Sequence, residues 1–169
     1  MDNVTVSQQA RKRQKQMELD YRVRDVARSI QKRFGSSAPM ISAMLGNINV
    51  ETGNTFDYKQ KQENGPGEGL FQFDFHKRNY KKYLNRKGLQ DGIDSQVEYV
   101  YDNIYGDEQE FLGSGNAKKL RHLFATSADP IKISDGFQNI FLRPNKKKAH
   151  TDRRREASRM YSLAFTPAR

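Results

Sequence analysis

Cysteine is missing from the 169-residue sequence, and only three histidines are present. The lack of cysteine excludes a disulfide scaffold and metal sites built on thiolates. The histidines are far apart in the sequence and form no cluster with carboxylates at metal-ligand spacing. We interpret them as surface or core residues: His76, His122 and His150. The sequence therefore gives no indication of a metal or another cofactor, and a metal-dependent nuclease is poorly supported.

Long apolar runs are also missing. No stretch approaches the roughly 18 apolar residues that a transmembrane helix needs, which excludes a membrane-spanning segment. Residues 1–30 are too polar for a secretory signal, because no apolar segment follows the basic cluster near the start. If the protein acts outside the cytoplasm, we expect another component to deliver it there.

Acidic residues are outnumbered: 20 Asp and Glu stand against 30 Lys and Arg, a formal net charge of +10. Such a surface attracts polyanions, among them nucleic acid, anionic wall polymers and membrane surfaces. Charge alone does not choose among these, and a basic surface also serves solubility. The charge is concentrated near both ends. A candidate partner-docking cluster, with a frayed basic helix as the alternative, comprises Arg11, Lys12, Arg13 and Lys15.

Hydrophobic periodicity predicts one mostly helical domain over residues 18–165. A basic N-terminal arm of residues 1–17 precedes it, with residues 1–9 expected to be disordered, and a short tail of residues 166–169 follows. Apolar residues recur at helical spacing in several segments. Helices are expected over about residues 10–34, 38–51, 76–87, 93–105, from 116, over 130–143 and over 151–165.

A polar insertion interrupts these helices. Residues 52–69 are rich in Gly, Asn, Gln and Lys and show no periodicity, and Leu70 to Phe75 is a short apolar and aromatic run. That run is compatible with a strand or with an extended loop. Insertions of this length within a compact domain are usually functional or disordered.

Glu51 is the most informative residue, because it continues the apolar face of Met44 and Ile48 at the end of a predicted helix. Burial raises the pKa of a carboxyl group, and the negative end of the helix dipole raises it further. A carboxyl group that stays protonated near neutral pH can serve as a general acid. The alternative is a helix that ends one turn earlier and leaves Glu51 exposed.

The segment Gly67 to Phe73 supports a binding role for this region. Its glycines allow the backbone to come close to a bound molecule. Phe71, Phe73 and Phe75 offer flat apolar faces on which sugars dock, although ordinary core packing explains them equally well.

Four segments, in order, resemble the phage tail lysozyme family. Met44 to Gly53 resembles its "GN…ESG" helix end, and Gly69 to Phe73 its "GLFQW" or "GLAQW" segment. Ile93 to Val100 resembles the helix that follows, and Phe141 to Pro144 with the basic helix after it resembles the family's "ERP…RR…A" close. The similarity covers roughly residues 38–163.

The resemblance implies a mainly α, lysozyme-like (α+β) fold, shared with goose-type lysozymes and lytic transglycosylases, with a small loop or β-hairpin insertion after the catalytic helix. It also implies cleavage of the β-1,4 bond between N-acetylmuramic acid and N-acetylglucosamine in peptidoglycan. In that family a Glu at a helix end protonates the glycosidic oxygen, a role that would fall to Glu51. Gln72 would lie on the cleft floor, and Phe71 and Phe73 would support or line the cleft.

Two positions depart from the family pattern. Thr52 replaces a Ser and keeps the hydroxyl group, so it stays a candidate for substrate binding, while Phe73 replaces a Trp and lacks the indole N–H. The insertion matches poorly, so the resemblance does not assign a second carboxylate. Candidates are Asp57, Glu63, Glu68 and Asp74.

These observations predict a phage-derived, virion-associated muramidase that acts in the host envelope on peptidoglycan. Either water or the sugar's own 6-hydroxyl would complete the reaction, giving hydrolysis or lytic transglycosylation. The alternative is a non-enzymatic virion protein with the same fold, which binds DNA or other virion proteins through its basic clusters.

Overall fold

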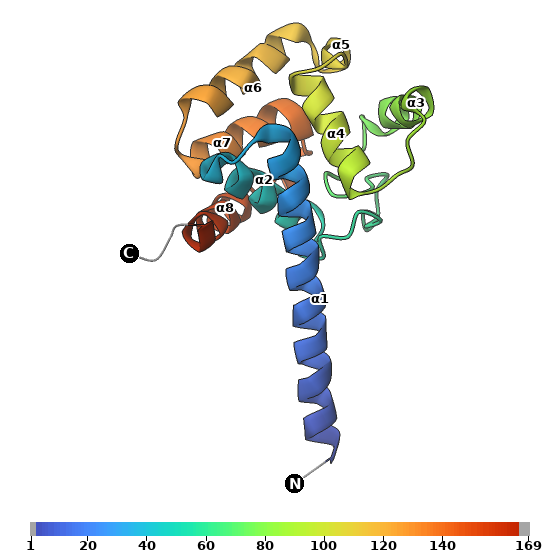
Figure 1. The fold of residues 1–169 in the computed structure, drawn as a ribbon, viewed down its shortest axis with the longest axis vertical. Helices are drawn as coiled ribbons and strands as arrows, with labels where there is room; N and C mark the ends of the chain where they lie inside the picture. Colours follow the sequence, from blue (N-terminus) through green and yellow to red (C-terminus); the bar gives the residue numbers. More distant parts are fainter. Residues whose placement is uncertain (1–2, 166–169) are drawn as a thin grey trace.

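The computed structural model describes residues 3–165 as a set of packed helices from which one helix projects (Figure 1). The α-helices are α1 (Asn3–Phe34), α2 (Ala38–Glu51), α3 (Lys77–Lys87), α4 (Ile93–Ile104), α5 (Gln109–Leu112), α6 (Ser114–Thr126), α7 (Pro130–Phe137) and α8 (Thr151–Phe165). A π-helical turn, Gln138–Leu142, continues α7, and a 3-10 turn, Lys146–Lys148, precedes α8.

Helix α1 is longer than the sequence predicted. It is continuous from Asn3 to Phe34, whereas the sequence predicted a helix only from about residue 10. Residues 3–9 contain neither proline nor glycine, and nothing in them breaks a helix. Residues 1–2 of the predicted arm and residues 166–169 of the predicted tail lie outside the described part of the chain.

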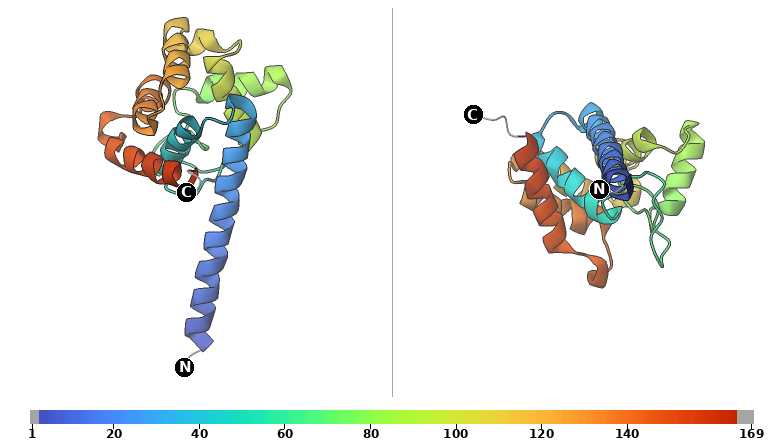
Figure 2. Two further views of the ribbon diagram at one scale, coloured as in Figure 1. Left: turned by 60° about the vertical axis from the view of Figure 1, so that its left-hand side comes forward. Right: turned by 90° about the horizontal axis from the view of Figure 1, so that it is seen from below.

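Helix α2 occupies the middle of the packed body, between α1 on one side and α8 on the other (Figure 2). Ser37 caps its first turn by accepting a hydrogen bond from the Met40 amide, and Pro39 sits where its missing N–H costs nothing. Helix α8 crosses α2 so closely that a Cβ atom on Gly46 would lie 2.6 Å from the Ser158 backbone nitrogen. Only glycine fits at this crossing.

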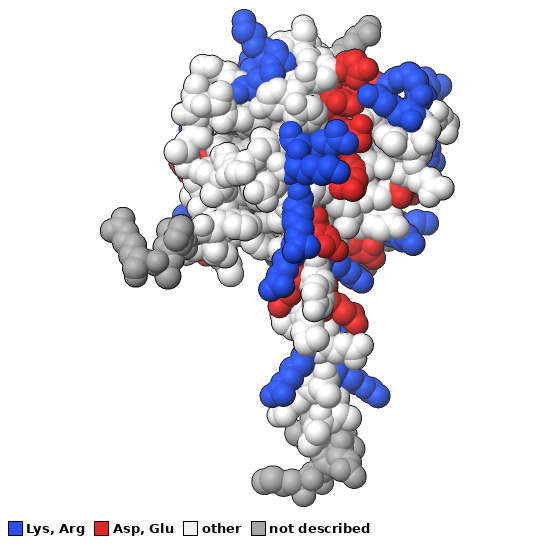
Figure 3. All heavy atoms as spheres, viewed as in Figure 1, with Lys and Arg blue, Asp and Glu red and all other residues white. Residues whose placement is uncertain are grey.

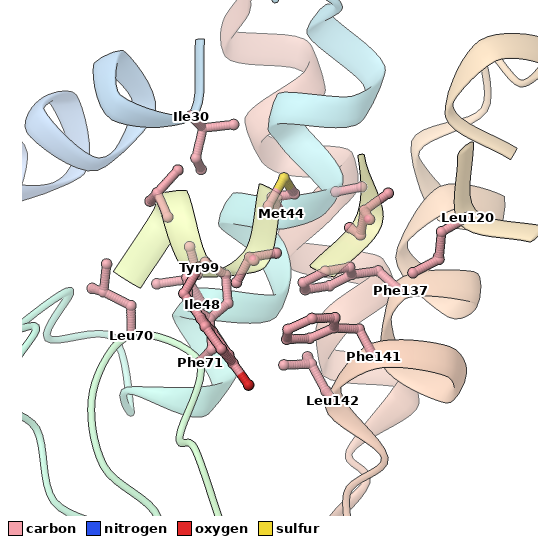
Figure 4. Close-up of a cluster of buried hydrophobic side chains, with 14 of the residues drawn as sticks. Ile30, Met44, Ile48, Leu70, Phe71, Tyr99, Leu120, Phe137, Phe141 and Leu142 are labelled. Carbon is pink, nitrogen blue, oxygen red and sulfur yellow. The ribbon is translucent and has the colours of Figure 1, made fainter. Parts of the chain in front are cut away.

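The core gathers around α2 and α4 (Figure 4). Met44 and Ile48 of α2 are fully buried, as the predicted stripe requires. Phe137 and Phe141 stack with ring centroids 5.2 Å apart, because the π-helical turn keeps both rings on the core side. The burial of aromatic side chains on several elements gives this core much of its apolar area.

The insertion between α2 and α3 folds as a loop with two isolated bridges, Lys61 to Glu68 and Glu68 to Phe73, and contains no described strand. Gln96 of α4 braces it: its side chain accepts from the Leu70 amide (2.8 Å) and donates to the Tyr58 carbonyl oxygen (2.9 Å). Gly69, at φ +86°, lies against this amide group, where a Cβ would be 2.6 Å from the Gln96 oxygen.

No helix within residues 3–165 combines the length and the apolar character that crossing a membrane requires.

Candidate active site

Glu51 ends α2, and its side chain is only 13% exposed. The helix therefore reaches this residue, and the alternative of an earlier end with an exposed carboxylate is wrong. Thr52 closes the helix with its amide bonded to the Ile48 carbonyl oxygen at 2.9 Å. Glu51 is thus held at the junction of a rigid helix and the polar loop.

Arg154 of α8 forms an ion pair with Glu51. Its side chain is 1% exposed, and its Nη1 lies 2.8 Å from Glu51 Oε1 and 3.1 Å from Asn47 Oδ1. Its Nε donates to the Ala149 carbonyl oxygen at 2.6 Å. Asn47, one turn before Glu51 on the buried face, in turn donates to Ser134 Oγ at 3.0 Å. Three helices therefore fix the position of the carboxyl group.

Arg154 was not among the site residues predicted from the sequence, because it lies within a run of basic residues. A signal was present, because Arg154 precedes Ala157 and Tyr161 on the apolar side of its helix, at spacings of three and seven. Asn47 gave a second signal as an uncharged polar residue on the buried face of α2.

Burial raises the pKa of Glu51 above its ordinary value, as the sequence analysis predicted. Arg154 acts in the opposite direction, through its charge and its hydrogen bond to the carboxylate. The loss of hydration is the larger of these effects, so the pKa of Glu51 stays raised.

A cavity of about 390 Å³ opens in front of Glu51. Its walls come from the end of α2, the polar loop and the start of α8, and they carry both acidic and basic side chains. The lining residues are Val50, Glu51, Thr52, Gly53, Gln60, Lys61, Gln62, Glu63, Gln72, Lys148, His150 and Arg154. Hydrogen-bonding side chains are numerous in this lining, which suits a polar ligand.

A larger groove of about 1180 Å³ adjoins this cavity and lies between α1, α2 and α8. The two spaces share Val50, Gly53 and His150 in their linings. A chain-like ligand bound at Glu51 therefore has room to continue beyond it.

Gln72 lies in the cavity wall, in a left-handed backbone conformation (φ 45°). Its Nε2 donates to the carbonyl oxygens of Gln60 and Gly69, each at 2.8 Å. Thr52 also reaches the cavity, but it is 2% exposed, and its hydroxyl group donates to Ile48 O and accepts from the Phe56 amide. Its hydroxyl group therefore holds the turn after α2, and a contact between Thr52 and substrate stays a prediction.

Phe71 and Phe73 are core residues, 2% and 3% exposed. They stack on each other at 5.8 Å, and Phe71 also meets Phe137 edge-on. Their rings cannot stack on a sugar in this structure, which corrects the expectation of direct contact and leaves a supporting role. Phe75 is 42% exposed, but it is not in the cavity lining.

The candidate second carboxylates are separated by the fold. Glu63 lines the cavity, whereas Glu68 is paired with Lys77 at 2.7 Å and faces another pocket beside α3 and α4. The Lys77 hydrogen bond and the neighbouring lysines lower the pKa of Glu68. Asp57 accepts from the Lys59 amide, and neither Asp57 nor Asp74 is in the cavity lining.

The N-terminal basic cluster lies away from the cavity, on the projecting half of α1. Figure 3 shows basic side chains on both sides of this part of the helix. Arg11, Lys12, Arg13 and Lys15 are all exposed there. A partner bound to this cluster would not cover Glu51.

The mainly α fold, with a sheltered carboxyl group at a helix end above a polar cavity, is that of a lysozyme-like protein. The chain belongs to the phage tail lysozyme family, whose sequence model matches residues 22–164. It is therefore a phage lysozyme-like protein that acts on peptidoglycan. No curated protein and no solved structure matches the chain.

Residues 3–165, so far as their side chains are described, contain no group of three or more His, Asp and Glu arranged to hold a metal ion. His76 lies in the core, with Nδ1 2.9 Å from the Tyr99 hydroxyl oxygen. His150 is exposed at the rim of the cavity.

Proposed function

We propose that the protein is a muramidase that cleaves the β-1,4 bond between N-acetylmuramic acid and N-acetylglucosamine, with Glu51 as the general acid. The observation that carries the proposal is the nearly buried carboxyl group of Glu51, whose pKa burial raises, in the wall of an open polar cavity. Such a group keeps a proton at a higher pH than an exposed Glu and can deliver it to a leaving oxygen.

The proton resides on Oε2 in this proposal, because Oε1 accepts a hydrogen bond from Arg154. Its transfer to the glycosidic oxygen lets the bond to the muramic acid anomeric carbon break, and the glucosamine leaves as an alcohol. Either water or the muramic acid 6-hydroxyl then adds to that carbon and releases a proton. Mass spectrometry separates these outcomes, since the second leaves a 1,6-anhydro end.

Glu63 is the candidate second carboxylate, because it shares the cavity with Glu51. Two-carboxylate glycosidases use the second group to activate water or to stabilise the sugar cation. We expect Glu63→Gln to slow cleavage, while Glu68→Gln, which removes a carboxylate outside the cavity, leaves the rate close to wild type. Equal rates in the two variants would remove Glu63 from the reaction.

The remaining contacts follow from charge and hydrogen-bonding capacity. Gln72 Oε1 is the atom we expect to accept a hydrogen bond from a sugar, because the Nε2 of this residue already donates to two carbonyl oxygens of the loop. Lys61 and Lys148 in the cavity wall suit the carboxylates of the wall polymer. Virion association and the basic surface would place the enzyme on the anionic wall of the host.

Solubilisation of purified peptidoglycan, followed as loss of turbidity, tests the proposal, because it detects hydrolysis and lytic transglycosylation alike. We expect Glu51→Gln to lower the rate by about a hundredfold or more, which is what loss of a general acid costs. Glu68→Gln is the control, because this carboxylate pairs with Lys77 and faces a separate pocket. Full activity of Glu51→Gln contradicts the role of Glu51. An inactive wild type on several wall types would favour the non-enzymatic virion protein that binds DNA or virion proteins.

A further inference from the structure

The projecting part of α1 is a single helix in solvent. From here on the arm means residues 3–21, which extend further than the arm predicted from the sequence. Residues 6–18, 20 and 21 of this segment are all exposed. An isolated helix of this length is only marginally stable in water. Within the body, by contrast, α1 is anchored by Val26 and Ile30, which are fully buried. The arm therefore gains little from its own domain.

One face of the arm has the residue spacing of a coiled coil. The residues on this face follow one another at intervals of four, three and four, so they lie in one line along the helix. Met17 and Tyr21 on this face are 56% and 61% exposed. At 3.6 residues per turn, the face points away from the side that carries Val26 and Ile30. We call this face the arm seam: Ala10, Gln14, Met17 and Tyr21.

Charges flank the seam in a segregated order. Arg11 and Arg13 lie on its two sides in the first half, and Glu18 and Asp20 lie on the same two sides in the second half. Gln14 Nε2 donates to Glu18 Oε1 at 3.2 Å, which holds this carboxylate close to the seam. The arm thus has a basic half and an acidic half in coiled-coil register.

We propose that two copies of this chain dimerise by antiparallel pairing of their arm seams. The twofold axis lies between residues 15 and 16. Ala10 then packs on the second copy's Tyr21, and Gln14 on its Met17, so that a small side chain meets a large one. On the two flanks Arg11 meets Glu18 and Arg13 meets Asp20, each pair occurring twice.

The parallel arrangement is disfavoured. It would place the two basic halves side by side and both globular bodies at the same end. Antiparallel pairing puts the bodies at opposite ends and on opposite outer sides, because each core-facing side of α1 points away from the seam. No described side chain of the arm lines the Glu51 cavity, whereas Asp20 also lines the adjoining groove.

Charge complementarity favours a second copy over a polyanion as the partner. A nucleic acid or a wall polymer would be attracted by Arg11 and Arg13 but repelled by Glu18 and Asp20, which flank the same face. Self-pairing satisfies all four residues. Since the seam is short and contains one polar Gln, we expect a weak dimer that added salt weakens further.

Sedimentation equilibrium over a range of protein concentrations tests the proposal on the full chain. The wild type should show a monomer–dimer equilibrium. Arg11→Glu with Arg13→Glu places like charges in every flanking pair and should weaken dimerisation about tenfold or more. Glu18→Arg with Asp20→Arg should do the same. An equimolar mixture of these two double variants restores all pairs and should form a heterodimer.

Lys12→Glu with Lys15→Glu is the matched control. It changes the net charge as much as the first double variant, but these positions lie on the side of the arm away from the seam. It should dimerise like the wild type, whereas a polyanion-driven assembly would lose binding in both. Circular dichroism checks that every variant stays helical. A wild type that is monomeric at all concentrations, or a mixture that stays monomeric, overturns the proposal.

Discussion

Glu51 and Arg154 form a nearly buried pair whose balance sets the chemistry of the site. Each charge loses hydration in this position, and the attraction between them offsets only part of that loss. The outcome is a carboxyl group with a raised pKa, held in a fixed orientation by the guanidinium group. Arg154 therefore positions the acid and limits the rise of its pKa.

Arg154→Met should destabilise the protein in a pH-dependent way. Without its partner, the pKa of Glu51 rises further, so the folded state holds a proton that the unfolded state releases above about pH 4.5. Stability then falls as the pH rises, by about 3–5 kcal/mol once Glu51 is charged. Urea denaturation at about pH 5 and at about pH 8 measures this difference in the free energy of unfolding.

Arg153→Met serves as the control for that experiment, since the neighbouring Arg153 is exposed. We expect it to change stability by about 0.5 kcal/mol or less at either pH. If Arg154→Met behaved in the same way, the pair would not contribute to the site as described.

At the residue scale the sequence predicted that Glu51 lies sheltered at a helix end, but it did not predict the residues that contact it. Glu51 stood out because a carboxylate on an apolar helix face is unusual, and the face continued to the predicted helix end. Arg154 did not stand out, because basic residues are abundant around it and its burial depends on how closely α8 approaches α2. The same reasoning applies to Phe71 and Phe73, whose aromatic character suited both a sugar platform and a core.

At the scale of elements, the crossing of α2 and α8 positions the site. Gly46 permits the close approach that brings Arg154 to Asn47 and Glu51. In the predicted motif, Gly46 thus permits the close helix packing, and Asn47 accepts the hydrogen bond from Arg154.

Gly46→Ala should force the two helices apart. The added Cβ would lie 2.8 Å from Ser158 Cα and 2.6 Å from its backbone nitrogen, and a backbone cannot yield as a side chain does. We expect a loss of stability of about 1–3 kcal/mol, together with reduced activity. Gly115→Ala in α6 is the control, because its Cβ would meet nothing within 4 Å and alanine favours a helix. Thermal unfolding that ranks the two variants equally would contradict the packing argument.

Most element boundaries followed from local signals, such as Ser37 before α2, Gly88 after α3 and Pro130 at the start of α7. The π-helical turn, Gln138–Leu142, did not, because a periodic apolar pattern does not distinguish it from a continued α-helix. Helix α5 was missed because its four residues are too few to show a period.

At the scale of the whole molecule, His76 joins three parts of the fold. It precedes α3, its Nδ1 contacts the Tyr99 hydroxyl group in α4, and its Nε2 lies 3.2 Å from the carbonyl oxygen of Phe141 in the π-helical turn. Burial lowers the pKa of His76 to about 4 from the ordinary 6.5. The imidazole ring is therefore neutral in the folded protein at neutral pH.

This difference predicts acid sensitivity. Above pH 6.5 the ring is neutral in the folded and in the unfolded protein. Between about pH 6.5 and 4 the unfolded chain binds a proton at this ring, whereas the folded protein does not. Stability should fall by about 3 kcal/mol as the pH drops through this range. His76→Gln removes that contribution, so its urea midpoint should change less between the two ends of the range.

His122→Gln provides the control, since His122 is exposed on α6. It should lose stability on acidification as the wild type does. If the wild type and the His76→Gln variant lost the same stability on acidification, the buried ring would not be the cause of the acid sensitivity.

The fold class followed from the sequence because long periodic helices carry most of the chain. The cavity did not follow, since its walls come from α2, the polar loop and the start of α8, and only the packing of these elements decides which polar residues meet. Glu63 and Glu68 illustrate this. They are five residues apart in one loop, yet they face different pockets.

The central claim is that Glu51 is a sheltered acid that holds its proton to a higher pH than an ordinary Glu. Carboxyl-carbon NMR titration of Glu51 in the wild-type protein, assigned by comparison with Glu51→Gln, tests this most directly. We predict a pKa above 4.5 for this carboxyl group. A pKa at or below that value would contradict the account.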